Sequence, residues 1–245
     1  MKIVTAGKRG FRTLNAEVRE ALETENEVRI EDVNGQRYIG AGLDRGKRLE
    51  VHGTPGNDMG AYLNGGTIEV FGNGQEAVGN TMGGGSVTVH GHVGDTLGYA
   101  MRDGEIYVEK RAGSRAGIHM KEFREMQPVV VIGGTVGAFL GEYMAGGTLV
   151  VLGLDRADTH PIVGAHCATG MHGGRIFVRG EVPQENLSEH IAVLAPDEKD
   201  LTDLDRFVRE YCARFGGDAA EILKVPFQKL VPTTSRPYAN LYTPN

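Results

Sequence analysis

The sequence predicts an all-β protein wound as one parallel β-helix, a single-stranded solenoid of about seven circuits. A 19-residue period carries this prediction, because the V-H-G of residues 51–53 is followed by Val70 and Val89 at the same spacing. A second series of large apolar residues keeps the period, and each member follows a glycine by three positions. This series begins Leu63, Met82, Met101 and Met120. Nineteen residues are too few for a strand and a crossover helix, which need about 30 or more, so each circuit must pair directly with the next.

Each circuit of the β-helix, which spans residues 40–180, contains a strand that follows a glycine turn. The strands alternate apolar and other residues, as in T-I-E-V and S-V-T-V, so that Ile68 and Val70 face inward while Glu69 faces outward. Circuits stacked about 4.8 Å apart bring the inward side chains into apolar columns. The chain has 37 glycines, enough to supply the corners where a Cβ atom would be penalised.

Residues 1–39 are predicted to cap the first end of the solenoid, whose edge would otherwise stay unpaired. Apolar residues recur at helical spacing from Leu14 to Leu22. The following V-R-I-E-D-V-N-G-Q-R-Y-I is typical of two strands joined by a hairpin at Asn34-Gly35. We therefore expect a helix and a hairpin before the first circuit.

The period breaks at two insertions, residues 121–128 and 154–163. The spacing between successive methionines of the series grows there from 19 to 24 and then to 27 residues. Loops grafted on a regular scaffold are either tolerated surface insertions or places where contacts are made. Both interpretations stay open.

Residues 181–245 are predicted to form a helical cap and an extended tail. Thr202 and Asp205 resemble a capping box that would begin a helix, and Gly216-Gly217 would end it. The expected buried stripe of this helix is Leu204, Phe207, Val208, Tyr211 and Cys212.

A short second helix and a proline-rich tail are expected to follow. Asp218 would start this helix, which runs through Leu223. The closing stretch contains four prolines and should be extended. An apolar terminus seldom stays ordered alone, so residues 232–245 are expected to pack on the flank of the solenoid or on a partner subunit.

One outward face of the solenoid changes from charged to apolar along the chain. The outward residue just before the last valine of each circuit is Glu50, then Glu69, then Thr88, and the later ones are apolar. The predicted exposed strip consists of Tyr107, Val130, Ile132, Val150, Leu152 and Phe177. A soluble monomer rarely leaves such a strip bare, so either the C-terminal helix of the same chain or another subunit covers it.

The residues form no complete catalytic, cofactor-binding or metal-binding set, and we assign no site residue of any of these kinds. The one cluster with side chains that suit zinc is His160, His166, Cys167 and His172. Its spacing matches no familiar zinc site. His52 and His90 lie two circuits apart, about 9.6 Å, which is too far for one ion. G-G-T-V-G-A-F-L-G lacks the strand-to-helix transition of a nucleotide fingerprint, and no G-x-S-x-G nucleophile motif occurs.

The composition indicates a soluble, cytoplasmic protein that binds neither nucleic acid nor membrane. The formal charge is −6, and the sequence has no basic cluster. Cys167 and Cys212 form no C-x-x-C motif, and the start M-K-I-V-T-A-G-K-R-G lacks the apolar run of a signal peptide. No stretch approaches the roughly 20 apolar residues needed to cross a bilayer.

The repeated G-x-x-M-x-G-G followed by an alternating strand, which runs through residues 60–180, resembles the glycine-motif (GXGXG) domain at the C-terminal end of the glutamate synthase large subunit. It also resembles the formylmethanofuran dehydrogenase subunit that shares this coil, and the motifs alone do not separate the two. The flanks L-N-A-E-V-R-E-A-L and V-P-F-Q-K-L-V-P-T-T-S-R-P-Y-A-N-L-Y look like those of stand-alone glutamate synthase domain proteins.

This resemblance implies a right-handed coil that serves as the third part of a glutamate synthase-like enzyme. Its partners would be a glutamine amidotransferase subunit and a synthase subunit that carries FMN and iron-sulfur clusters, while the coil itself carries no cofactor and no catalytic group. Two features depart from the family pattern. The insertion around Phe123 replaces a glycine pair, and Ala168 stands where the other circuits have glycine three residues before the methionine.

The leading hypothesis is a non-catalytic structural subunit of a complex that transfers ammonia from glutamine to 2-oxoglutarate on its partner subunits. The alternative within the same class is the β-helix subunit of a formylmethanofuran dehydrogenase-type complex. An independent β-helix hydrolase or lyase is the third, because polysaccharide-cleaving β-helices work with clustered outward acids. The outward acids of this chain are Glu50, Glu69, Glu105 and Glu109. Solvated strand-face charges explain them better, since most alternate with polar or basic neighbours.

Overall fold

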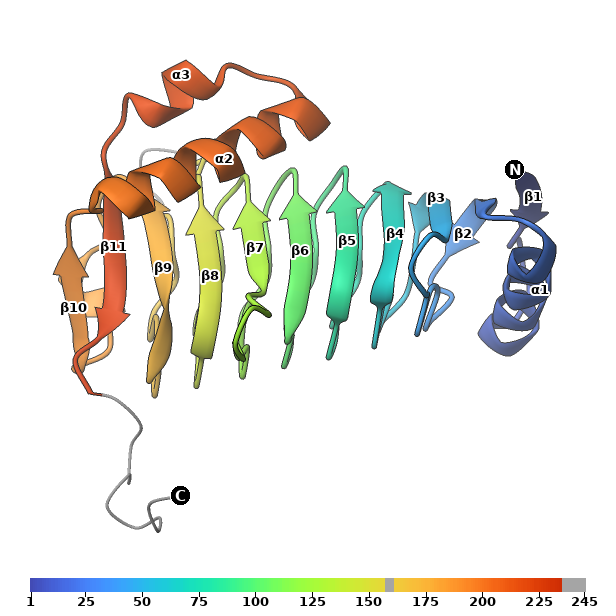
Figure 1. Cartoon of the computed structure of the whole chain (residues 1–245), viewed down its shortest axis with the longest axis horizontal. Helices are drawn as coiled ribbons and strands as arrows, with labels where there is room; N and C mark the ends of the chain where they lie inside the picture. Colours follow the sequence, from blue (N-terminus) through green and yellow to red (C-terminus); the bar gives the residue numbers. More distant parts are fainter. Residues whose placement is uncertain (157–160, 235–245) are drawn as a thin grey trace, which may run out of the picture.

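The computed structural model describes residues 1–156 and 161–234, and Figure 1 shows them as an elongated solenoid with strands lying across its long axis. The strands of the solenoid are β1 (Lys2–Thr5), β2 (Glu27–Asn34), β3 (Arg48–Thr54), β4 (Asn64–Phe71), β5 (Gly83–Val89), β6 (Asp103–Val108), β7 (Val129–Ile132), β8 (Ala145–Val151) and β9 (Gly173–Arg179). The remaining elements are α1 (Phe11–Thr24), the 3₁₀ helix η1 (Gln184–Asn186), β10 (Ile191–Leu194), α2 (Glu198–Phe215), α3 (Ala219–Leu223) and β11 (Phe227–Pro232).

The strands form one sheet in which β1 to β9 follow each other in chain order and pair in parallel. The sheet ends with β11, which pairs antiparallel with β9, and then with β10. The predicted parallel β-helix is confirmed. Because β1 and β2 belong to the same stack, the parallel pairing begins before residue 40.

Apolar side chains stack in columns inside the coil because equivalent residues of successive circuits pair in register. One column is Leu49, Ile68, Val87, Ile106, Val130, Leu149 and Ile176, all fully buried. The predicted methionine column is also confirmed, and it consists of Leu63, Met82, Met101, Met120, Met144 and Met171. Fully burying one such side chain stabilises the fold by about 1.5–3 kcal/mol, so these columns are the main source of stability.

Each circuit turns a corner in which three alternating residues adopt left-handed backbone conformations. In one circuit they are Asp58, Gly60 and Tyr62, with φ of 61°, 68° and 56°. Left-handed conformation costs a residue with a side chain about 1–2 kcal/mol, so only the packing around the corner holds it. Ala168 keeps a φ of 62° where the other circuits have glycine, and this departure therefore leaves the backbone path unchanged.

The predicted N-terminal helix is α1, but the predicted hairpin at Asn34-Gly35 is wrong. β2 ends at Asn34 and lies between β1 and β3 in parallel, and the edge strand β1 was not predicted. Gly35 has a φ of 79°, and its amide donates to Thr54 of the next circuit at 2.7 Å. A two-residue hairpin and a solenoid corner both favour a glycine with positive φ, so this dipeptide alone does not distinguish them.

The capping box that begins the helix α2 lies five residues before the predicted one at Thr202 and Asp205. The Asp197 carboxylate accepts from the Asp200 amide at 2.9 Å, and the Asp200 carboxylate accepts from the Asp197 amide at 3.0 Å. This reciprocal pair satisfies two orphan donors at the true start of the helix. Thr202 lies inside α2 and donates to the Glu198 carbonyl.

The end of the chain follows the prediction as far as the structure describes it. Gly216 ends α2, and the Asp218 side chain caps α3 by accepting from the Ala220 amide at 2.8 Å. The expected extended stretch is confirmed for β11, whereas β10 was not predicted. Residues 235–245, which make up most of the predicted tail, lie outside the described residues.

Both insertions occur at the places where the period breaks. In the first, Phe123 and Met126 exchange two backbone hydrogen bonds of 3.0 and 3.1 Å, which makes a tight loop. The second includes residues 157–160, which are not described. Before them, the Asp155 carboxylate accepts from Arg111 Nε at 2.9 Å and from the Thr135 amide at 3.0 Å, so this insertion is tied to the neighbouring circuits.

Gly53→Ala is expected to destabilise the protein by about 2–4 kcal/mol, because it combines left-handed strain with overpacking. Gly53 has a φ of 116°, and an added Cβ atom would lie 2.2 Å from the Val33 carbonyl oxygen of the preceding circuit. The matched control is Gly46→Ala, where φ is 80° but nothing lies within 4 Å of the added atom. The control should cost only about 1 kcal/mol. Urea denaturation of both variants measures the difference, and equal losses would contradict the close stacking of the circuits.

Candidate interaction face of the solenoid

The outward face of the sheet changes character along the solenoid, as predicted. One outward column runs through residues that pair directly across neighbouring strands. These residues are Glu50, Glu69, Thr88, Tyr107, Val131, Val150 and Phe177. The column is therefore charged over β3 and β4 and apolar from β6 onward.

Two of the six residues predicted for the apolar strip are wrong. Val130 and Ile132 face the core of the coil, and Val129 and Val131 take their places on the outside. The error is a slip of one residue in β7, whose sequence V-V-V-I has no polar residue to mark its outer side. The apolar strip, as the term is used below, consists of Tyr107, Val129, Val131, Val150, Leu152 and Phe177.

The helix α2 covers the apolar strip, so the first of the two predicted coverings is confirmed. Figure 1 shows α2 crossing β9, β8 and β7 along the length of the solenoid. Its buried side chains form one apolar cluster with the strip, and they include Leu204, Phe207, Val208 and Tyr211. Tyr107 and Phe177 beneath it are fully buried. This part of the face is thus occupied by the chain itself.

Polar contacts fix α2 on the strip. Tyr211 donates its hydroxyl hydrogen to the Glu109 carbonyl oxygen at 2.7 Å, and burial raises the pKa of this hydroxyl. Arg206 reaches Glu105 of β6 at 2.8 Å. Two of the four outward acids therefore contact α2. Glu105 does so through its side chain and Glu109 through its backbone carbonyl.

A buried charge cluster anchors the first turn of α2. The Asp200 carboxylate, whose side chain is 2% exposed, lies 2.8 Å from Arg175 and 2.5 Å from Lys229. Burial alone would raise the pKa of Asp200, but hydrogen bonds from Lys229, the Asp197 amide and Arg175 hold it below its usual value. The hydrogen bond to Asp200 raises the pKa of Lys229 in turn. A carboxylate buried this deeply depends on both cations.

The charged part of the face continues beyond the end of α2. Phe215, the last residue of α2, meets His90 edge-on with ring centroids 5.1 Å apart. From there His90, Phe71 and His52 stack along the solenoid with centroid spacings of 4.7 and 4.9 Å. Phe71 stands between the two imidazoles, which agrees with the prediction that they cannot share one ion.

The acids of this charged part are paired, which supports a structural role for them. Glu50 contacts His52 at 2.6 Å and Arg29 at 2.7 Å, and the His52 hydrogen bond contributes most to lowering the pKa of Glu50. Glu69 pairs with Arg48 and lies 3.0 Å from His90. These pairings offset the repulsion between carboxylates that are direct neighbours across β3 and β4.

Of the histidine and cysteine cluster weighed for zinc, the three members that the structure describes make separate contacts. His160 lies outside the described residues. Cys167 is fully buried inside the coil, and burial raises the pKa of its thiol to about 12. His166 stacks on Phe139, and His172 Nδ1 lies 3.1 Å from the Gly170 carbonyl. Across residues 1–156 and 161–234, no group of three or more His, Cys, Asp or Glu side chains could hold a metal ion.

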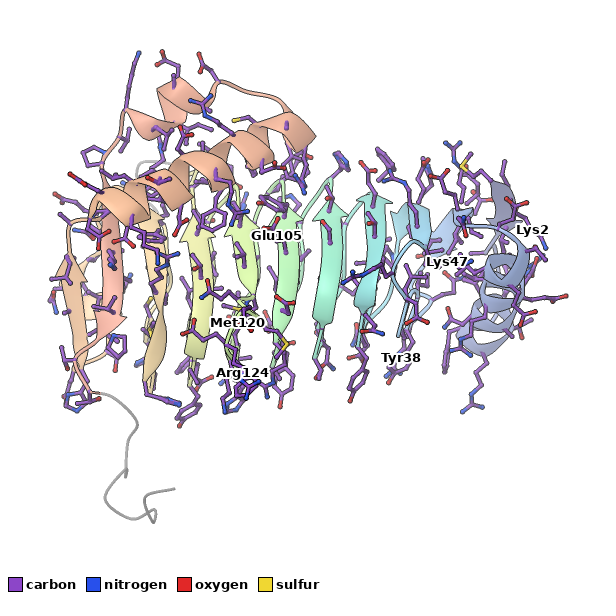
Figure 2. All side chains as sticks on the ribbon, viewed as in Figure 1. Lys2, Tyr38, Lys47, Glu105, Met120 and Arg124 are labelled. Carbon is purple, nitrogen blue, oxygen red and sulfur yellow. The ribbon has the colours of Figure 1, made fainter. Side chains whose placement is uncertain are left out.

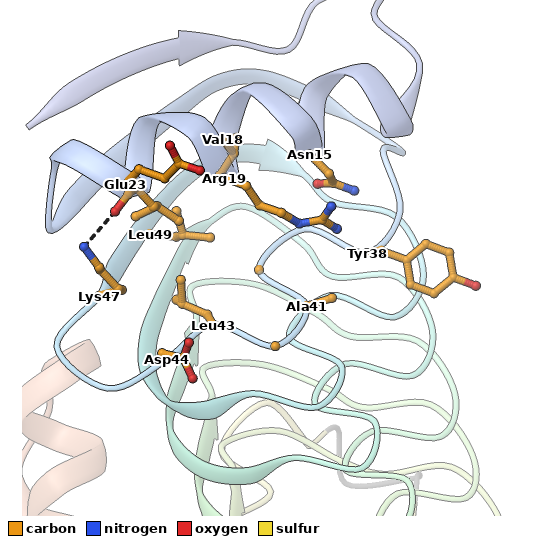
Figure 3. Close-up of a pocket in the computed structure, with 13 residues that line it drawn as sticks. Asn15, Val18, Arg19, Glu23, Tyr38, Ala41, Leu43, Asp44, Lys47 and Leu49 are labelled. Atoms are coloured by element: carbon orange, nitrogen blue, oxygen red, sulfur yellow. Dashed lines mark hydrogen bonds between the residues drawn. The ribbon is translucent and has the colours of Figure 1, made fainter.

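A pocket of 330 Å³ lies between α1 and the first corner of the coil (Figure 3). Its floor is apolar and includes Val18, Leu43 and Leu49. Lys47 at its rim donates to the Leu22 carbonyl at 2.7 Å and to the Glu25 carbonyl at 3.1 Å, near the end of α1. The pocket therefore lies at the junction between the N-terminal cap and the coil.

None of the helices in the described ranges has the length and hydropathy to span a membrane.

Three comparisons place the chain among known proteins. The family described as “GXGXG motif” matches residues 12–235. The uncharacterized protein MJ1350 of Methanocaldococcus jannaschii is 38% identical over 252 residues, covering 99% of this chain and 97% of that protein. Among solved structures, a chain of the formyltransferase/hydrolase complex (FhcABCD) from Methylorubrum extorquens, in complex with methylofuran, superposes with a TM-score of 0.63. It is 21% identical, covering 85% of this chain and 78% of that chain, so this likeness shows the fold alone.

Val150→Asp is expected to lower the free energy of unfolding by about 3–5 kcal/mol, because it places an unpaired carboxylate under α2. The matched control is Leu201→Asp on the exposed side of α2, where the leucine is 54% exposed. The control should stay within about 0.5 kcal/mol of wild type. Urea denaturation measures both, and a Val150→Asp protein as stable as the control would show that α2 does not cover the strip.

Asp200→Asn is expected to lose about 3–5 kcal/mol of stability at neutral pH, because Arg175 and Lys229 lose their shared anion. The folded-state pKa of Asp200 is depressed, so its contribution is present above the unfolded value of about 3.9 and is lost as pH falls through the folded value. Wild type should therefore lose more stability than the variant as the solution is acidified below about pH 4.

The control for this acid-dependent loss is Asp205→Asn, which removes an exposed pair with Arg209 on the same helix. It should change stability by less than about 1 kcal/mol. Chemical denaturation across the acid range is the measurement. Parallel pH profiles for wild type and Asp200→Asn would contradict the anchoring role.

Proposed function

The chain belongs to the GXGXG motif family, and on that premise we propose that it is a structural subunit that holds the catalytic subunits of a larger enzyme in fixed relative positions. The observation that carries the proposal is the continuous parallel pairing of the coil. Every strand from β1 to β9 pairs in parallel with the next. At about 4.8 Å per step, the stack makes a rigid body about 40 Å long between its first and last parallel strands.

A body of this kind suits the work of a scaffold. A flexible linker leaves two bound partners free to sample many separations, whereas a packed coil fixes one separation and lowers the entropy cost of assembling both. The buried columns of the coil make this geometry resistant to bending. The chain contributes spacing and orientation, and its partners contribute the chemistry.

The partners that we propose are a glutamine amidotransferase subunit and a synthase subunit that carries FMN and iron-sulfur clusters. The two flanking sequences that look like stand-alone glutamate synthase domain proteins support this choice. In such an assembly, ammonia released from glutamine on one partner is added to 2-oxoglutarate on the other and reduced there. The catalytic groups and cofactors belong to the partner subunits.

A second candidate is the β-helix subunit of a formylmethanofuran dehydrogenase-type complex. The specific observation in its favour is the fold shared with a chain of the formyltransferase/hydrolase complex, with a TM-score of 0.63 over 85% of this chain. Both candidates keep the scaffold role of the coil. They differ in the partners, and therefore in the reaction that the complex performs.

The proposal is tested by purifying the tagged chain from native cells, with untagged cells as the control, and identifying stoichiometric partners by mass spectrometry. We expect an amidotransferase and a flavoprotein to co-elute, and we expect the isolated chain to show neither glutaminase activity nor bound flavin. Molybdenum- or tungsten-site partners would favour the second candidate. A chain that elutes without any partner, or that hydrolyses glutamine alone, would overturn the scaffold role.

A further inference from the structure

We propose that the edge of the solenoid opposite α2 is a docking surface for an acidic segment of a partner subunit. This inference rests on the proposed function, because it names the surface by which one partner binds. In Figure 2 the labelled Tyr38 and Arg124 lie along this edge, while α2 lies along the other. The inference comes from the aromatic and cationic side chains gathered there.

Three tyrosines on this edge have exposed side chains. Tyr62 is 64% exposed, Tyr143 is 47% exposed and Tyr99 is 37% exposed. His119 joins two of these rings, because it stacks on Tyr143 at 5.4 Å and meets Tyr99 edge-on at 6.0 Å. We call Tyr62, Tyr99, His119 and Tyr143 the aromatic edge. Tyrosine is enriched at the centres of protein interfaces, so a row of exposed tyrosines is typical of a binding surface.

A groove of 630 Å³ opens beside the aromatic edge and is lined by cations. Its polar lining is Tyr99, Arg102, His119, Lys121, Tyr143 and His172. No carboxylate is part of this lining in the described part of the chain. Arg102 is held in place by a hydrogen bond of 3.1 Å to the His119 carbonyl oxygen. Lys121 is exposed and makes no ion pair with any described residue. The groove therefore presents two permanent positive charges that the described chain does not neutralise.

The charge of the groove is opposite to that of the whole chain. The chain carries a formal charge of −6, whereas the lining of the groove holds two cations and two imidazoles. Complementary charge speeds encounter and fixes the register of two surfaces. An acidic segment is the occupant that this groove attracts. Two permanent cations are few for a nucleic acid, whose binding requires a row of phosphate contacts.

The insertion after Lys121 adds an apolar contact beside the groove. Phe123 is 54% exposed and Met126 is 38% exposed, and the Arg124 guanidinium lies over the Phe123 ring at 5.0 Å. Phenylalanine, methionine and arginine are enriched in interface cores, where an apolar anchor supplies affinity that charge alone does not. The aromatic edge, the groove and the insertion together form a surface with both an anchor and a charge preference.

The decisive experiment is zero-length carbodiimide crosslinking of the complex purified from native cells, because this reagent joins a lysine amine only to a carboxylate in direct contact. We expect Lys121 to crosslink to an Asp or Glu of a partner subunit. Lys121→Glu should reduce the amount of that partner recovered at least about fivefold, and rising salt should weaken the wild-type complex. Phe123→Ser is a second variant and should also reduce recovery.

Matched controls separate docking from folding. Lys110→Glu reverses an exposed charge on the turn after β6, and Leu201→Ser removes an exposed apolar residue from α2. Both should leave partner recovery unchanged, and thermal unfolding should confirm that all four variants fold. A complex that forms with Lys121→Glu as well as with wild type would overturn the inference and leave the scaffold role intact. Crosslinks from Lys121 only to a second copy of this chain, or nucleic acid bound in the groove, would also overturn it. A chain that co-purifies with no partner would overturn both proposals.

Discussion

The structure depends on one constraint, which is that each circuit must lie within hydrogen-bonding distance of the next along the whole sheet. Near the start of the strands this leaves no room for a side chain at certain positions, as at Gly85 of β5, where a Cβ atom would lie 2.2 Å from the Gly66 carbonyl oxygen. Inside the coil the same spacing stacks like residues on like residues, which produces the apolar columns. An extra residue within a strand would turn its side chains to the wrong face, and the described residues of both insertions, 121–128 and 154–163, lie between strands.

The same stacking also brings like residues together on the outward face, where their charge or apolar surface has to be compensated. A column that carries glutamates in neighbouring circuits would repel itself, and the structure offsets this by pairing each of Glu50 and Glu69 with one arginine and one histidine. Where the column becomes apolar, its side chains must be shielded from water, and α2 covers them. The helix can lie along the strip because residues of the strip pair directly across the strands from β6 to β9. The buried Asp200 cluster then fixes where the helix begins.

Much of this could be predicted from the sequence, because a repeat converts weak local signals into one that recurs in every circuit. The parallel coil, the methionine column and α2 on the apolar strip all follow from periodicity. The errors occur where a local signal fits two structures equally well. Asn34-Gly35 suits a hairpin and a corner, V-V-V-I suits either phase of a strand, and Thr202 and Asp197 both stand where a helix could begin. The edge strands β1 and β10 are four residues each, too short for a periodic pattern to show.

The groove beside the aromatic edge joins residues from several circuits, and this is why it was not predicted from the sequence. Its lining includes Arg102, Lys121 and His172, which directly follow members of the methionine series. A comparison of that position across the repeat could have indicated the groove.

The surfaces that α2 leaves uncovered determine where partner subunits could bind to the coil. A scaffold needs at least two surfaces that different partners can occupy at the same time. In this chain α2 closes the apolar strip, and the surfaces left open have distinct chemistry. The stacked His52, Phe71 and His90 lie on the sheet face beyond the end of α2, whereas the aromatic edge and its cationic groove lie along the opposite edge. Because both surfaces are built on one rigid stack, a partner on each would be held at a distance set by the coil. The register that stabilises the fold would then also set the geometry of the assembly.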